Sequence, residues 1–173
     1  MDYVDLYLIH WPVKGKRKQS WKALEELYKS KRVSAIGVAN YLVPFLEEMK
    51  TYATVLPTVN QVEFTPYVFS KPLLDYCVRK DIQLQAYSPL ARGHKNKDPK
   101  LLRVAKKYKK TPAQLMLRWC VQHHVSPIPK SADKTRQLEN INIFDFSISK
   151  EDMDIMDGFS EDYRVAPNPI AML

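Results

Sequence analysis

Short apolar runs recur along the chain, and polar or turn-forming residues bound each of them. Runs of this length that are apolar throughout are typical of strands buried on both faces of a parallel sheet. The first run ends in His10, Trp11 and Pro12, so an imidazole and an indole follow the point where the strand stops. We expect five such strands, at residues 6–9, 33–40, 58–64, 82–90 and 125–128.

Amphipathic stretches fill the intervals between the apolar runs. Residues 20–31 place Trp21, Leu24 and Leu27 on one face of a helix. The alternation of strands and helices continues without a linker, which predicts one α/β domain with a parallel sheet, either doubly wound or a (β/α) barrel. The later helices are expected to begin at capping residues or prolines, at Pro44, Ser70, Asp98, Thr111, either Ser131 or Asp133, and Ser149. Thr111 and Gln114 are expected to form a capping box.

The chain holds four glycines, and none of them has the G-x-G-x-x-G or phosphate-loop spacing. A doubly wound nucleotide-binding sheet normally has such a turn after a strand. Any nucleotide bound by this chain must therefore be held in another way.

Composition narrows the class of protein. The 173 residues are 45% hydrophobic, which is enough for one buried core. No stretch is long and apolar enough to cross a bilayer, and no basic leader precedes the first strand, so we expect a cytoplasmic protein without a membrane partner. Cys77 and Cys120 provide neither a disulfide framework nor a metal-ligand set, so we expect no metal.

The net charge of +8 raises the question of a nucleic-acid partner. The basic residues gather in a short loop at residues 14–18 and on one helical face at residues 106–110, without interleaved aromatic residues. This distribution is typical of a solvated surface, so we expect no nucleic acid. A nucleotide phosphate is a smaller and more plausible anion.

Polar residues follow the expected strands, and the carboxyl ends of parallel strands are where binding sites lie. Carboxamides can hydrogen-bond a ligand amide, a tyrosine can stack on a flat ring, and cations at a helix start can bind phosphate. Taken singly, each residue is better explained by a turn or by packing. The candidates are His10, Trp11, Asn40, Asn60, Gln61, Glu63, Tyr87, Ser88, Lys130 and Ser131, with Arg136 nearby.

Five segments together resemble the aldo-keto reductase family. They are LYLIHWP, AIGVANY, NQVEFTPY, LQAYSPLARG and IPKSADKTRQLEN, in the family's order and at suitable spacings over essentially the whole chain. The resemblance implies a partial (β/α)8 barrel, in which residues 1–173 are the C-terminal part of the domain and the five strands correspond to strands 4–8. It also implies NADPH-dependent reduction of aldehydes and ketones to alcohols.

The same resemblance implies roles for individual residues. His10 is the catalytic histidine that orients the substrate carbonyl, and Trp11 lies beside it in the substrate pocket. Lys and Arg at a helix start suit a 2′-phosphate, so NADPH and its oxidised form NADP are expected in preference to NADH. The implied cofactor contacts are Asn40 and Gln61 with the carboxamide, Tyr87 with the nicotinamide ring, Ser88 and Leu90 with the pyrophosphate, Lys130, Ser131 and Arg136 with the 2′-phosphate, and Glu139 and Asn140 with the adenine.

The chain departs from the family pattern in two respects. Ala39 stands where the family usually has serine, which removes one hydrogen bond to the carboxamide at a cost of about 1 kcal/mol. The first three βα units are absent, and with them the aspartate, the tyrosine proton donor and the lysine of the catalytic tetrad. His10 is the remaining member.

These departures leave two hypotheses for function. In the first, the chain reduces carbonyl compounds only together with the missing N-terminal part. In the second, it is an inactive truncated barrel that serves as a nucleotide-binding or assembly module. The expected partners are a small carbonyl substrate and, through open sheet edges, either the N-terminal half or another copy of the chain.

Overall fold

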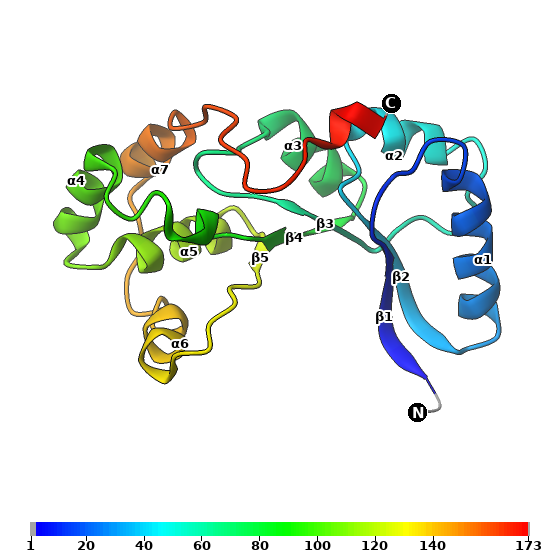
Figure 1. The fold of residues 1–173 in the computed structure, drawn as a ribbon, viewed down its shortest axis with the longest axis horizontal. Helices are drawn as coiled ribbons and strands as arrows, with labels where there is room; N and C mark the ends of the chain where they lie inside the picture. Colours follow the sequence, from blue (N-terminus) through cyan, green and yellow to red (C-terminus); the bar gives the residue numbers. More distant parts are fainter. Residues whose placement is uncertain (1–2, 173) are drawn as a thin grey trace. The chain divides into compact units, whose positions relative to one another are not determined.

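The computed structural model describes residues 3–172, which contain a five-stranded sheet with helices alongside it (Figure 1). The strands lie in chain order, and the printed pairings β1–β2, β2–β3 and β4–β5 are parallel. The predicted sheet of five parallel strands is confirmed. The strands are β1 (Val4–Ile9), β2 (Val33–Ala39), β3 (Val59–Glu63), β4 (Gln83–Tyr87) and β5 (Ser126–Pro127).

Helices fill the connections where the sequence predicts them. The caps Ser70, Asp98, Thr111 and Ser149 each accept a backbone N–H with the side chain, and Thr111 with Gln114 forms the predicted capping box. The described helices are α1 (Arg17–Lys29), α2 (Val43–Met49), α3 (Lys71–Arg79), α4 (Pro99–Tyr108), α5 (Pro112–Gln122), α6 (Lys134–Ile141) and α7 (Lys150–Asp157), with the 3₁₀ turns η1 (Ala91–Gly93) and η2 (Pro169–Met172).

The chain forms two compact units. The first comprises Met1–Val62, Ser70–Leu84 and Pro167–Leu173, and the second comprises Glu63–Phe69 and Gln85–Ala166. His10, Trp11, Asn40 and Gln61 belong to the first unit, whereas the candidate residues from Tyr87 onward belong to the second.

In the first unit, β1 pairs with β2 from Val4↔Val33 to Ile9↔Val38, and α1 lies beside both strands (Figure 1). Gly37 in β2 is needed for the approach of β3. A Cβ atom at this position would stand 2.5 Å from the carbonyl oxygen of Val59 and 2.7 Å from Cδ2 of Leu8. Only glycine fits such a contact without moving the neighbouring strand.

Glu25 joins α1 to the loop before β3. Its carboxylate is 1% exposed and accepts hydrogen bonds from the backbone N–H groups of Thr54 (2.6 Å) and Val55 (2.9 Å) and from Nζ of Lys22 (2.7 Å). Burial alone would raise the pKa of Glu25, but the hydrogen bonds from Lys22, Val55 and Thr54 outweigh it and lower the pKa to about 2. The ionised carboxylate is therefore part of the folded structure.

In the second unit, an aromatic cluster forms the core beneath α5. Trp119 is fully buried and stacks on Phe64 with the ring centroids 4.9 Å apart. Asp157 of α7 accepts hydrogen bonds from Nε1 of Trp119 (2.8 Å) and pairs with Nε2 of His123 (2.8 Å). These polar contacts satisfy the indole and imidazole nitrogens while the rings fill the core.

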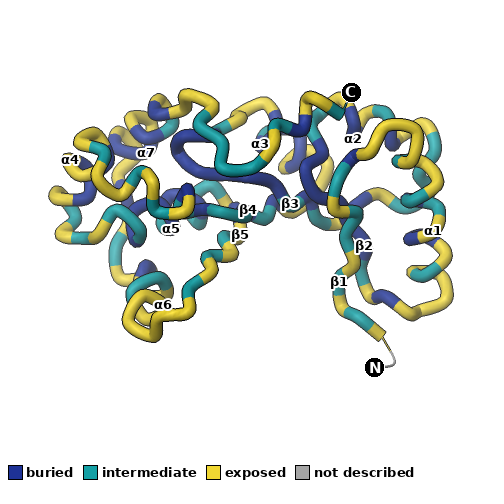
Figure 2. Tube along the Cα trace, viewed as in Figure 1, coloured by how far each residue is buried: buried dark blue, intermediate teal, exposed yellow. Residues whose placement is uncertain are grey.

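Two strands are shorter than expected. β4 ends at Tyr87 and not at residue 90, because Ser88 has a left-handed backbone with φ of 46°. The fifth strand is limited to Ser126–Pro127, because the prolines at 127 and 129 have no N–H to donate to a ladder. Leu138 and Ile141 of α6 have the spacing of one apolar helix face, but they are 70% and 67% exposed. Figure 2 shows α6 as exposed or intermediate along its length, so this helix is not held by burial.

Among the described residues, no helix combines the length and the hydropathy that crossing a membrane would require.

We predict that Glu25→Gln lowers the free energy of unfolding at pH 7 by roughly 2 to 3 kcal/mol, because the variant loses an ionised acceptor whose pKa is depressed by folding. The pKa in the folded chain lies below the ordinary value of 4.5, so this stabilisation is complete above that value and declines as the pH falls toward 2. Urea unfolding at several pH values measures the difference between variant and parent. Glu26→Gln, on the exposed face of the same helix, is the matched control, and a difference that does not change with pH would contradict the prediction.

Candidate functional site

In the first unit, His10 and Trp11 directly follow β1. His10 is exposed and Trp11 is half-buried, and their ring centroids lie 6.1 Å apart at an interplanar angle of 43°. Within residues 3–172, the His10 imidazole forms no hydrogen bond with another side chain or backbone group. The ring can therefore donate to a ligand carbonyl without first breaking a hydrogen bond of the protein.

Two residues with carboxamide side chains, Asn40 directly after β2 and Gln61 within β3, are joined through their backbones. Ala39 pairs with Gln61, and the N–H of Asn40 donates to the carbonyl oxygen of Gln61 at 2.8 Å. The Nδ2 atom of Asn40 donates to the backbone carbonyl oxygen of His10 at 3.0 Å. The structure thus links Asn40 to the backbones of His10 and Gln61. Gln61 lies within β3 and not at its end, where the sequence placed it.

Asn40 has a left-handed backbone conformation, with φ of 65°. Asparagine tolerates this region better than most residues do. The conformation ends β2 and turns the chain toward α2, which begins at Val43.

In the second unit, Tyr87 ends β4 and is half-buried. Burial raises the pKa of Tyr87 to about 12, and the carboxylate of Glu63 adds to the rise, while Arg164 and Arg92 oppose it. The phenol is therefore neutral near pH 7, and the ring offers a flat apolar face with a polar end.

The segment after Tyr87 has an unusual backbone. Ser88, Ala91 and Arg92 have φ of 46°, 45° and 53°, and Gly93 follows with φ of 82°. Left-handed conformations cost free energy in residues that carry a Cβ, and they concentrate at ligand sites. Alternation of left- and right-handed residues also turns successive N–H groups to one side, which forms concave sites for anions.

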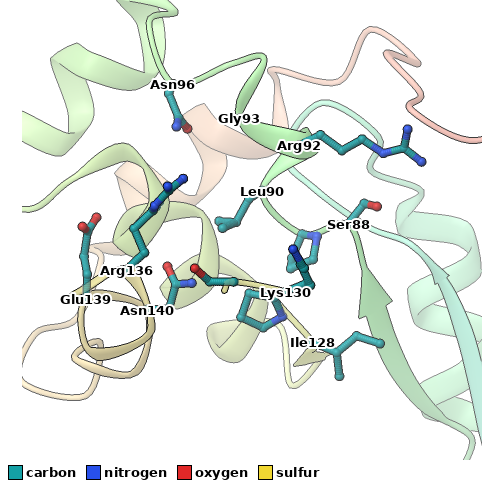
Figure 3. A pocket seen from close by; sticks show the side chains of 14 residues that line it. Ser88, Leu90, Arg92, Gly93, Asn96, Ile128, Lys130, Arg136, Glu139 and Asn140 are labelled. Atoms are coloured by element: carbon teal, nitrogen blue, oxygen red, sulfur yellow. The ribbon is translucent and has the colours of Figure 1, made fainter. Parts of the chain in front are cut away.

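This segment forms one wall of a cavity of about 600 Å³ in the second unit (Figure 3). The segment after β5 and the helix α6 form the other walls, and α6 supplies Arg136, Glu139 and Asn140. The structure therefore brings together the residues that the sequence analysis assigned to pyrophosphate, 2′-phosphate and adenine. The predicted residues in the lining are Ser88, Leu90, Lys130, Ser131, Arg136, Glu139 and Asn140.

A second cavity of about 370 Å³ lies at the start of α6 and is lined by residues 130–133 and Arg136. Lys130 and Arg136 are both exposed there. Asp133 is the helix cap and accepts the N–H of Arg136 at 2.9 Å. Two cations and the hydroxyl of Ser131 thus surround a space that can accept a phosphate group.

The helix α6 has no buried apolar face. Polar contacts from the start of α5 hold it instead. The Nε2 atom of Gln114 donates to the carbonyl oxygens of Glu139 (3.3 Å) and Asn142 (2.9 Å). The hydroxyl of Thr111 donates to Oε1 of Glu139 at 2.5 Å. Gln114 was expected only as a capping residue, and its second role could not be found from local sequence.

Other lining residues were missed by sequence reasoning. Arg92 and Gly93 belong to the LQAYSPLARG segment, so the family motif contained a signal for them. Asn96 and Ala113 had no signal, because they reach the cavity from the loop after η1 and from the first turn of α5.

Comparison with known proteins identifies the family. Residues 1–161 match the Aldo/keto reductase family. The chain belongs to that family. This confirms the resemblance inferred from the five segments.

Individual aldo-keto reductases match along almost all of the chain. Glyoxal reductase of Bacillus subtilis is 50% identical over 173 residues, which are 100% of this chain and 63% of the relative. The crystal structure of a mutant of Gox0644 in complex with NADPH superimposes with a TM-score of 0.91 at 35% identity, over 98% of this chain and 64% of that one. An aldo-keto reductase of Bombyx mori in complex with NADP has a TM-score of 0.88 at 30% identity, over 96% and 61%.

The chain thus spans less than two thirds of the length of these relatives. The predicted partial barrel agrees with this match, because the five parallel strands correspond to only part of each relative.

We predict that Gln114→Glu loosens α6 while leaving α5 capped. A glutamate at this position can still accept the Thr111 N–H, but it cannot donate to the carbonyl oxygens of Glu139 and Asn142. Amide hydrogen exchange in residues 134–141 should become about tenfold faster, which corresponds to the loss of one or two hydrogen bonds.

Gln122→Glu is the matched control, because Gln122 donates from the same helix to the carbonyl oxygen of Ile148 at 2.9 Å. It should leave exchange in residues 134–141 unchanged. Equal exchange of α6 in the parent and in Gln114→Glu would show that Gln114 does not hold the helix.

Proposed function

We propose that the chain is the cofactor-binding and substrate-orienting part of an NADPH-dependent reductase of aldehydes and ketones. The cavity of the second unit carries the proposal, since it gathers seven residues that the family resemblance assigns to the cofactor. The resemblance and the matches to named reductases agree with it. Residues 1–173 are proposed to act together as the C-terminal part of one reductase domain.

The residues present fit such a cofactor. A cavity of about 600 Å³ is within the usual range for sites that hold small molecules and cofactors. Lys130, Ser131 and Arg136 would hold the 2′-phosphate, and Ser88 with Leu90 would contact the pyrophosphate. Glu139 and Asn140 would contact the adenine. When bound, NADPH supplies a hydride to the substrate carbonyl carbon.

The first unit would supply the contacts with the reacting end. Asn40 and Gln61 would hydrogen-bond the nicotinamide carboxamide, and the His10 imidazole would donate to the carbonyl oxygen of the substrate beside Trp11. By the family resemblance, Tyr87 is proposed to stack on a nicotinamide ring, a role that suits its neutral phenol.

Reduction also needs a proton for the carbonyl oxygen. In the family this proton comes from a tyrosine in the first three βα units, which the 173 residues do not include. We therefore propose that turnover depends on an N-terminal part with those units. β1 and β5 are the terminal strands of the sheet, and strand edges of this kind are suited to further pairing.

A small carbonyl compound is the proposed substrate. The relative from Bacillus subtilis is named a glyoxal reductase, so glyoxal is the first substrate to assay. The cytoplasmic location stays a prediction.

The second candidate function is a nucleotide-binding or assembly module without turnover. Its support is that only His10 of the tetrad stands at the strand ends described above. The two candidates make the same prediction for cofactor binding and opposite predictions for turnover.

We predict that the chain binds NADP⁺ more tightly than NAD⁺ and that Arg136→Met removes most of this preference. Loss of one charged hydrogen bond to the 2′-phosphate should weaken NADP⁺ roughly tenfold to a hundredfold, with NAD⁺ affinity unchanged within about twofold. Titration calorimetry with both nucleotides measures the ratio.

Lys134→Met provides the control, because Lys134 is an exposed cation in the same helix that lines neither cavity. It should leave the preference intact. Equal affinity of the parent chain for NADP⁺ and NAD⁺ would refute the proposed 2′-phosphate site.

We predict that the chain alone oxidises NADPH with glyoxal at a rate ~10²-fold or more below that of a complete reductase, because general acid catalysis contributes that much. Adding the N-terminal part of the Bacillus subtilis relative as a separate polypeptide should restore turnover. NADPH absorbance measures the rate, and His10→Ala should remove the restored activity. If the chain binds NADP⁺ but turnover is not restored, the result would favour the nucleotide-binding or assembly module.

A further inference from the structure

Asn60 is the most deeply buried polar residue of β3 that has no assigned role. It has no exposed surface, and its carboxamide hydrogen-bonds the backbone of Tyr41 and the side chain of Cys77. Nδ2 of Asn60 donates to the carbonyl oxygen of Tyr41 at 2.8 Å, and the N–H of Tyr41 donates to Oδ1 of Asn60 at 3.4 Å. Both ends of one side chain therefore hold one peptide segment.

Tyr41 is the residue that directly follows Asn40. The left-handed Asn40 is fixed on both sides. Its own N–H donates to the carbonyl oxygen of Gln61. The next residue, Tyr41, is held by its two hydrogen bonds with Asn60. Asn40 in turn donates from Nδ2 to the carbonyl oxygen of His10. A continuous set of hydrogen bonds thus runs from Asn60 through the β2 end to the β1 end.

We propose that Asn60 is a positioning residue for the nicotinamide end of the cofactor. By holding Tyr41, it keeps Asn40 in the left-handed conformation from which the Asn40 carboxamide contacts the nicotinamide carboxamide. It acts only through Asn40 and touches neither cofactor nor substrate. This inference rests on the proposed function, because it presupposes that Asn40 binds the nicotinamide.

The chemistry of the position supports this role over simple packing. A fully buried carboxamide in a strand costs free energy unless its donors and acceptor are paired. An apolar side chain would fill the same space in a sheet core at lower cost. Asn60 directs a donor and its acceptor to Tyr41, so these two hydrogen bonds fix the backbone directly after the left-handed Asn40.

The test compares two ligands that share the adenosine end. NADP⁺ has the nicotinamide, whereas adenosine 2′,5′-bisphosphate lacks it. In Asn60→Ala, the affinity for NADP⁺ should fall about tenfold, as expected for one or two lost hydrogen bonds. The affinity for the bisphosphate should stay within about twofold. Asn60→Asp should show at least the same loss, because a carboxylate oxygen would face the carbonyl oxygen of Tyr41.

Thr58→Val is the matched control. The Thr58 hydroxyl donates to the carbonyl oxygen of Ile36 at 3.0 Å and so joins the same two strand segments, away from Asn40. Its loss should lower stability without changing the ratio of the two affinities.

A measurement on the parent chain removes the dependence on variants that fold poorly. NADP⁺ should slow amide exchange at Tyr41 more than the bisphosphate does, because only NADP⁺ engages Asn40, the residue directly before Tyr41.

Each outcome decides between the alternatives. An unchanged affinity ratio in the Asn60 variants, or equal protection of Tyr41 by both ligands, overturns the positioning role. Equal losses for both ligands show that Asn60 is structural only. If the parent chain binds neither ligand, the proposed function itself is wrong, and the positioning role is refuted with it.

Discussion

Parallel strand pairing is the interaction on which both parts of the candidate site depend. In the first unit, the pairing of Ala39 with Gln61 continues into the bond between the N–H of Asn40 and the carbonyl oxygen of Gln61, which fixes the backbones of these two residues. In the second unit, Ala86 pairs with Pro127, and the segments that follow β4 and β5 line one cavity. A slip of one residue in either pairing would move alternate side chains to the opposite face. The cavity lining and the placement of Asn40 and Gln61 would then both be lost.

Much of this arrangement could be predicted from the sequence because its determinants are local. Apolar runs predicted the strands, and caps such as Ser70, Asp98 and Ser149 predicted where helices begin. The order of strands then follows from short parallel connections. The strand ends alone identified candidate binding residues but not their roles, because each residue taken singly was better explained by a turn or by packing. The roles came from the family segments, and the cavity in the second unit gathers the residues those segments assign to one end of a nucleotide.

The features that escaped prediction depend on contacts distant in sequence. Leu138 and Ile141 have the spacing of a buried helix face, but no described element of the chain covers them. Gln114 looks like an ordinary member of a capping box until α6 is seen to lie against its Nε2 atom. The left-handed conformations of Ala91 and Arg92 have no local signal either, because neither residue favours that region. Tertiary structure imposes such conformations, and sequence periodicity does not record them.

The two units hold their candidate ligand groups by different physical means. Asn40 is itself buried and is held by hydrogen bonds to the neighbouring strand segments, where reduced dielectric strengthens each bond. Arg136, Glu139 and Asn140 stand on an exposed helix without a buried side chain, which polar contacts from α5 hold in place. Exposed elements with few apolar contacts open at lower free energy than core strands do. The Asn40 carboxamide would thus be held in place before the proposed cofactor binds. Any entropic cost of ordering would fall mainly on α6, where charge interactions with a phosphate would offset it.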